Sequence, residues 1–202
     1  FGLHYRSRVK HDLEGDGTFV VPAPVAGMLP AGLFSATDAD AEIEFPYSIS
    51  LSGYHRINNR WAVMGDVTWT HWRTFDELVV EFDNPIQPDS ILDLDWNNTF
   101  RFSLGGAWTP NSRWEVRGGL LFDQGPVPTK TRTPRIPDAD RFWVTAGVGY
   151  QINRCMRVDL SYAHIFGTDE EIRQSSPTAG TLLGSYEDSD ADLLGVQFTV
   201  DF

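Results

Sequence analysis

Apolar side chains recur at every second position through long stretches of this 202-residue chain, as in a β-strand with one apolar and one polar face. The clearest stretch has Leu194, Val196, Phe198, Val200 and Phe202 on its apolar side. No run of about 18 apolar residues occurs, which excludes a membrane-spanning helix. We therefore expect about eight strands and no helix, the other alternating stretches being residues 1–10, 43–52, 61–70, 100–109, 114–123, 142–152 and 156–166.

The connections between these strands alternate between short and long. In an antiparallel meander every second connection lies at the same end, so the tight turns gather at one end and the long loops at the other. This asymmetry is typical of bacterial outer-membrane barrels, whose tight turns face the periplasm. The sequence thus predicts an all-β, transmembrane antiparallel barrel, with tight turns at 57–60, 110–113 and 153–156 and long loops at about 11–41, 83–95, 124–140 and 167–191.

Aromatic residues are placed near both ends of the predicted strands, where barrels carry girdles at the two membrane surfaces. Phe202, the last residue, is expected to face outward. The predicted girdles consist of Trp61, Trp108 and Trp114 beside the tight turns and Trp69, Trp96, Phe142 and Phe166 toward the long loops.

Charge and motifs exclude several classes of function. The net charge of −12 makes nucleic acid an unsuitable partner, and the single Cys155 excludes an internal disulfide framework. No hydrolase, zinc-protease or nucleotide-binding motif is present, so we expect no enzyme, no cofactor and no metal site. Acidic clusters at 169–171 and 187–190 either keep the loops soluble or hold divalent cations.

Five cations are candidates for receiving an anionic ligand inside the barrel. Arg6, Arg8 and Lys10 occupy alternate positions of the first predicted strand, and Arg101 and Arg117 take polar-face positions of later strands. Either these groups form ion pairs within the lumen, or one or two remain unpaired and bind the head group of a passing molecule.

Residues 20–34 form an uncharged segment with three prolines inside the first long loop. An outer loop this apolar is not expected to stand free in water. It either folds over neighbouring loops as a rigid flap or lines a groove for an apolar ligand, the candidate contacts being Val25, Met28, Leu29, Leu33 and Phe34.

Three strings, GLHYRSRVKHDLEGDGTF (2–19), WAVMGDVTWTHWRTFDELVVEFDNP (61–85) and DQGPVPTKTRTPRIPDADRFWVTAGVGYQI (123–152), resemble the FadL/TodX-type outer-membrane transporters. The most specific part is the PVP…IPDxDRFW pattern in the third string. The resemblance implies a fourteen-stranded barrel with an N-terminal hatch, of which residues 1–202 are a single C-terminal barrel region. The hatch and roughly the first six strands are then absent.

The resemblance also implies a function. We expect passive transport of long-chain fatty acids or related hydrophobic compounds through the lumen of a multi-pass barrel in a Gram-negative outer membrane. The expected surroundings are outer-membrane lipid and lipopolysaccharide, and the expected state is a monomer. A general diffusion porin and a structural or adhesin barrel remain as alternatives.

Overall fold

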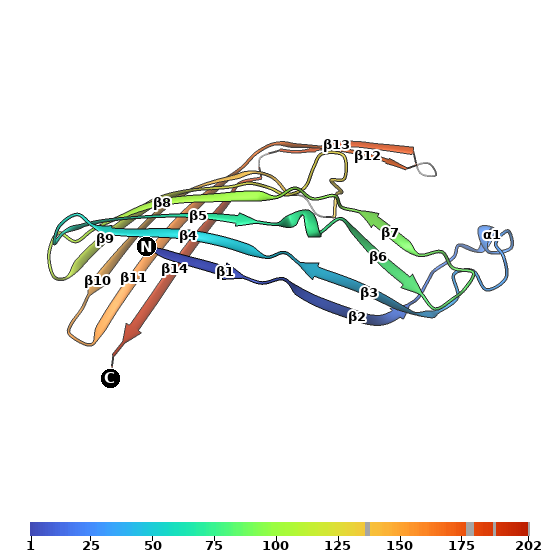
Figure 1. Ribbon diagram of the computed structural model, residues 1–202, viewed down its shortest axis with the longest axis horizontal. Coiled ribbons are helices and arrows are strands. Elements are labelled where there is room, and N and C mark those ends of the chain that lie inside the picture. Colours follow the sequence, from blue (N-terminus) through green and yellow to red (C-terminus); the bar gives the residue numbers. More distant parts are fainter. Residues whose placement is uncertain (136–137, 177–179, 188, 202) are drawn as a thin grey trace.

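The computed structural model describes residues 1–135, 138–176, 180–187 and 189–201, which form three antiparallel sheets (Figure 1). The largest sheet contains eight strands, one for each alternating stretch, in the order in which these stretches occur along the chain. The predicted strands 1–10 and 43–52 are each divided, because residues 9–10 and 43–45 belong to a second sheet. The strands of the largest sheet in spatial order are β1 (Gly2–Arg6), β4 (Ser48–Arg56), β5 (Trp61–Thr70), β8 (Thr99–Trp108), β9 (Trp114–Asp123), β10 (Arg141–Gln151), β11 (Met156–Gly167) and β14 (Ala191–Val200).

The other two sheets extend from the end of the large sheet that is opposite the tight turns (Figure 1). We call the four-stranded sheet and its connections the arm; the third sheet is a hairpin. The arm contains β2 (Val9–Gly17), β3 (Thr37–Phe45), β6 (Glu77–Phe82) and β7 (Ser90–Asp93), and the hairpin contains β12 (Glu170–Ser176) and β13 (Gly180–Tyr186).

Large apolar side chains of the eight-stranded sheet point to one face and are exposed there. Leu104 and Val196, for example, retain 64% and 76% of their accessible surface. Among the described residues no large side chain is fully buried, so the chain lacks the core of a soluble two-sheet sandwich. An apolar exposed face opposite a polar one is the arrangement of a membrane barrel wall. We call the polar side the inner face.

The three predicted tight turns are confirmed, and they lie together at one end of the sheet (Figure 1). In each turn an asparagine carboxamide accepts hydrogen bonds from backbone N–H groups of the turn. Asn58 Oδ1 lies 2.8 Å from the amide nitrogen of Arg60. Asn111 and Asn153 make the equivalent bonds to Arg113 and Cys155 at 2.9 Å. Asparagine favours turns because its short side chain can satisfy these donors.

Three of the four predicted long loops are wrong as loops, because they contain strands. The first is mostly β2 and β3, whose pairing continues that of β1 and β4: Arg6 faces Ser48, and Val9 faces Phe45. The ladder is interrupted near Pro46, whose nitrogen carries no hydrogen to donate. Acidic residues alternate along β2 and β3, so their charge conceals a regular strand pattern.

Two smaller expectations also change. The predicted absence of helix is wrong by one turn, α1 (Ala23–Ala26), and one 3₁₀ turn, η1 (Trp72–Thr74). Trp96 is not part of an outer girdle, because it packs against Trp72 and Phe75 outside the strands. Trp61 and Trp108 do stack beside the tight turns, with ring centroids 5.7 Å apart. Phe202 lies outside the described residues.

Candidate functional site

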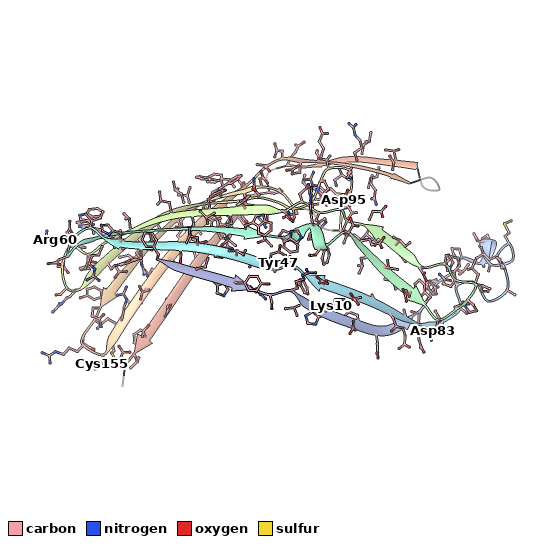
Figure 2. All side chains as sticks on the ribbon, viewed as in Figure 1. Lys10, Tyr47, Arg60, Asp83, Asp95 and Cys155 are labelled. Carbon is pink, nitrogen blue, oxygen red and sulfur yellow. The ribbon has the colours of Figure 1, made fainter. Side chains whose placement is uncertain are left out.

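A pocket of about 530 Å³ lies where the eight-stranded sheet meets the arm, and we call it the mouth pocket. Tyr47, labelled in Figure 2, marks this junction. Hydroxyl-bearing residues of the inner face line one side, and the segment that follows β9 contributes another. These lining residues include Ser48, Thr70 and Thr99 from the sheet and Gln124 and Pro126 from the segment.

Aromatic rings form the apolar wall of the mouth pocket. Phe45, Trp72 and Trp96 all line it. The ring centroids of Trp72 and Trp96 are 5.1 Å apart, and Phe75 supports Trp96 at 4.9 Å. Clustered aromatic rings present a large rigid apolar surface, which suits contact with a hydrocarbon.

Three arginines line the same pocket: Arg6, Arg101 and Arg141. Arg141 Nη2 lies 3.3 Å from Asp123 Oδ2 and 3.4 Å from Asp138 Oδ1. Within the described part of the chain, Arg6 and Arg101 form no ion pair or side-chain hydrogen bond, so their guanidinium groups remain available. A guanidinium presents a planar set of donors that matches a carboxylate or phosphate.

Asp138 and Arg141 are incompletely satisfied in this pocket. Asp138 Oδ2 and Arg141 Nε are buried without a hydrogen-bond partner among the described residues. Burial raises the pKa of Asp138 above the ordinary value for an aspartate, although the Arg141 guanidinium acts in the opposite direction. The pocket therefore contains polar atoms with unused hydrogen-bonding capacity.

Further along the inner face, toward the tight turns, lies a second cavity of about 730 Å³. Most of the inner-face residues that line it have short side chains or none. Gly119, Thr145, Ala163 and Leu193 belong to one row across β9, β10, β11 and β14. This row has no charged member, so we call it the uncharged belt.

Arg117 belongs to a network of ion pairs between the belt and the tight turns, which we call the turn-end network. Asp159 accepts from Arg117 and from Arg157, whose Nε lies 2.8 Å from Asp159 Oδ2. Glu115 Oε1 lies 3.5 Å from both arginines. All four charges therefore have partners, which is the arrangement that minimises the cost of placing charges on a narrow inner wall.

The structure places Arg8 and Lys10 differently from the sequence prediction. Both lie in or next to the arm rather than on the first strand of the large sheet, and Val9 rather than Arg8 lines the mouth pocket. Arg8 Nη1 is 2.8 Å from Glu44 Oε1, and Lys10 Nζ is 2.6 Å from Glu42 Oε1. The hydrogen bond to Glu42 raises the pKa of Lys10. The prediction of an inward row of three cations is therefore wrong beyond Arg6, because the strand is interrupted after it.

The five apolar candidates lie at the tip of the arm. Val25 and Met28 are exposed, while Leu29, Leu33 and Phe34 are half-buried. The Phe34 amide donates to Gln87 Oε1 at 3.0 Å, which joins this tip to the connection between β6 and β7. This docking agrees with the flap alternative, whereas a ligand role for the tip stays a prediction.

Sequence reasoning does not single out Trp72, Trp96, Asp138 or Arg141 as site residues. The tryptophans adjoin strand ends and resemble girdle residues, so their proximity appears only after β6 and β7 fold back. Asp138 and Arg141 lie in the string that carries the family resemblance most specifically, which is the signal that could have found them.

The described residues contain no group of three or more His, Cys, Asp or Glu side chains arranged to hold a metal ion. Among the carboxylates of the acidic clusters, Glu170 is engaged with Arg132. No helix in the described part of the chain is both long and apolar enough to cross a membrane.

Sequence comparison identifies relatives over the whole chain. A family model described as "Outer membrane protein transport protein (OMPP1/FadL/TodX)" matches residues 1–202. The outer membrane protein NMB0088 of Neisseria meningitidis is 30% identical over 219 residues, and a long-chain fatty acid transport protein of Escherichia coli is 29% identical over 208. Both matches cover the full chain but only 47% and 46% of the relatives, so the chain spans about half their length.

Structural comparison agrees with the predicted fold. A Pseudomonas aeruginosa FadL homologue superposes with a TM-score of 0.81 at 23% identity, covering 99% of this chain and 48% of that one. The Pseudomonas putida toluene transporter TodX gives 0.60 at 22% identity, covering all of this chain and 45% of TodX. The all-β barrel prediction is confirmed at the level of fold, and the outer-membrane location and the non-enzymatic class follow from the family. The chain belongs to the OMPP1/FadL/TodX family of outer-membrane transport proteins.

Proposed function

We propose that the protein carries long-chain fatty acids, or similar hydrophobic molecules with an anionic head, across the outer membrane without energy input. The observation that carries this proposal is the mouth pocket, in which two unpaired guanidinium groups and an aromatic wall face the same space. The relatives include proteins named as long-chain fatty acid transporters. They also include structures of toluene transporters, so the choice of substrate rests on the arginines.

The two sides of the mouth pocket match the two parts of an amphipathic acid. A carboxylate head would lie near Arg6 and Arg101, where a charge-assisted hydrogen bond contributes about 1.5–3 kcal/mol. The hydrocarbon tail would contact Phe45, Trp72 and Trp96, each buried CH₂ contributing roughly 0.8 kcal/mol. A molecule that has both parts is therefore bound better than a molecule that has only one.

The rest of the inner face supports passage beyond the pocket. The uncharged belt offers short side chains and no fixed charge to hold a head group. In the turn-end network Arg117 and Arg157 already contact Asp159, so they compete weakly for a second anion. The anion is thus favoured at the mouth and released along the wall, which suits downhill passage.

The test compares binding of oleate with binding of oleyl alcohol in the complete protein, purified from its outer membrane. Replacing Arg6 and Arg101 with Gln should weaken oleate binding about tenfold or more and leave oleyl alcohol nearly unchanged. Arg117→Gln is the matched control, because it removes a cation of the same face that is already paired, and oleate binding should persist.

Two results would contradict the proposal. Equal binding of oleate by wild type and by the Arg6→Gln/Arg101→Gln variant would mean that the pocket selects by apolar contact alone, as a neutral hydrocarbon channel would. Rapid uptake of small sugars without binding of either lipid would favour a general diffusion porin.

A further inference from the structure

Residues 124–140, with 136 and 137 outside the described part, form the one predicted long loop in which the described residues contain no strand. The segment is nevertheless well anchored. It supplies Gln124, Pro126 and Asp138 to the lining of the mouth pocket. Whatever holds this segment in place therefore also sets one wall of the pocket.

Arg132 is the buried centre of the segment, with 5% of its side chain exposed. Its Nη1 lies 2.8 Å from Glu170 Oε2, an ion pair that reaches to β12. The same guanidinium donates to three backbone carbonyl oxygens: Val127 at 2.9 Å, Glu171 at 3.0 Å and Asp138 at 3.2 Å. A buried arginine that is satisfied in this way fixes the backbone around it.

Two of those carbonyls are next to or part of the pocket lining. Val127 follows Pro126 directly, and Asp138 itself lines the pocket. The carbonyl of Pro126 also accepts from the amide of Asn97 at 2.8 Å. Gly125 allows the beginning of the segment to pack closely against Asp138, because a Cβ at residue 125 would stand 2.8 Å from Asp138 Oδ2.

We propose that Arg132 is a positioning residue for the mouth pocket: it holds Pro126 and Asp138 in place from behind and so sets ligand affinity without touching the ligand. Lysine cannot replace it fully, because an ammonium group lacks the planar set of donors that reaches four acceptors at once. The inference rests on the proposed function, since the mouth pocket is taken as the ligand site.

The test uses the complete protein and measures binding of both oleate and oleyl alcohol. Arg132→Leu should weaken both about tenfold, because the displaced wall affects head and tail contacts alike. Arg132→Lys should give an intermediate loss. Lys130→Leu is the matched control: it removes one charge from the same segment, but Lys130 is exposed and its one ion-pair partner among the described residues is Asp95, so binding should change less than about twofold.

A second measurement needs no ligand. Hydrogen exchange of the Asn97 amide, which donates to Pro126, should accelerate in Arg132→Leu and stay unchanged in Lys130→Leu. Barrel assembly is checked by the heat-dependent shift in electrophoretic mobility. If Arg132→Leu does not assemble, Glu170→Gln replaces it, because that change removes only the ion pair.

The outcomes separate the two proposals. Unchanged exchange and unchanged binding in the Arg132 variants would overturn the positioning role. Loss of oleate binding alone would also overturn it, because that pattern indicates a charge effect rather than a displaced wall. If the Asn97 amide exchanges faster in Arg132→Leu but the wild-type protein binds neither lipid, the positioning role of Arg132 is supported and the proposed function is overturned.

Discussion

Arg101 and Arg117 lie on the neighbouring strands β8 and β9 and both belong to the inner face, yet among the described residues only Arg117 has an ion-pair partner. Arg117 reaches across β10 to Asp159 of the turn-end network. Arg101 faces Asp123 directly across β8 and β9, but Asp123 contacts Arg141 from its other side. Arg101 is thus available to a ligand because a neighbouring strand has engaged its nearest carboxylate.

Two glycines of β10 make the ion pairs of the turn-end network possible. Arg157 and Asp159 cover Gly149, where a Cβ would stand 2.2 Å from Arg157 Nη2 and 2.6 Å from Asp159 Oδ1. A Cβ at Gly147 would lie 3.7 Å from Arg117 Nε. Long side chains can therefore lie flat across β10 and meet carboxylates on the next strand. At the mouth, β10 instead begins with Arg141, which supplies a competing cation.

The largest expected effect tests the assignment of the apolar and inner faces, on which the comparison of the two arginines depends. Val144→Arg places a charge on the apolar face in mid-strand and should destabilise the barrel by roughly 2–4 kcal/mol. Thr145→Arg, one residue away on the inner face, should assemble far better. The stability of both variants is measured by unfolding in urea, with the folded fraction read from the heat-dependent mobility shift. Equal damage at the two positions would mean that the faces are misassigned.

The next effect compares carboxylates of the two regions. Asp159→Asn leaves Arg117 and Arg157 with Glu115, 3.5 Å away, as their one carboxylate partner among the described residues, and should cost about 1–3 kcal/mol, a range reduced for partial exposure. Asp123→Asn should cost less, because Arg141 keeps Asp138 at 3.4 Å. Urea unfolding of the two variants gives the loss of stability in each. A larger loss of stability in Asp123→Asn than in Asp159→Asn would contradict the distinction between the paired turn end and the mouth.

A smaller effect is a pH dependence confined to the mouth pocket. Because the folded-state pKa of Asp138 is raised, protonation favours the folded state, and this contribution is lost as pH rises through that pKa. As pH falls through the same pKa, Arg141 loses one of its two carboxylate partners, the other being Asp123. Binding of dodecyl sulfonate, which stays ionised, should therefore strengthen by a few-fold.

Asp138→Asn is the control for that pH dependence. The variant should bind dodecyl sulfonate at neutral pH as tightly as wild type does at low pH, because its side chain carries no charge in either condition. A pH profile that survives in Asp138→Asn would assign the titration to another group and would contradict the role given to this carboxyl.

The smallest expected effect separates the arm from the pocket. Arg8→Gln and Lys10→Gln should leave oleate binding and stability unchanged within error, since both cations are exposed, pair with Glu44 and Glu42, and do not line the mouth pocket. Equilibrium binding beside the Arg101→Gln variant measures this. A loss of oleate affinity as large as that in Arg101→Gln would mean that Arg8 or Lys10 takes part in ligand binding.

Much of the fold follows from local sequence. The eight alternating stretches become the eight strands of the large sheet, and Asn58, Asn111 and Asn153 mark its tight turns. Residues 37–42 of β3 are missed because acidic residues alternate there with Thr37, Ala39 and Ala41, so no apolar face signals a strand. Strand pairing there depends on the partner strand rather than on burial of one face.

Within an uninterrupted strand the sequence alone determines which side chains face lipid and which face inward, because the period of a strand is two and parity needs no knowledge of neighbours. It also places Arg6, Arg101 and Arg117 on the inner face. Only the tertiary structure decides which of them is free. Ion pairing depends on carboxylates brought alongside by strands distant in the chain, on glycines that leave room between them, and on the interruption at Pro46 that removes Arg8 and Lys10 from the wall.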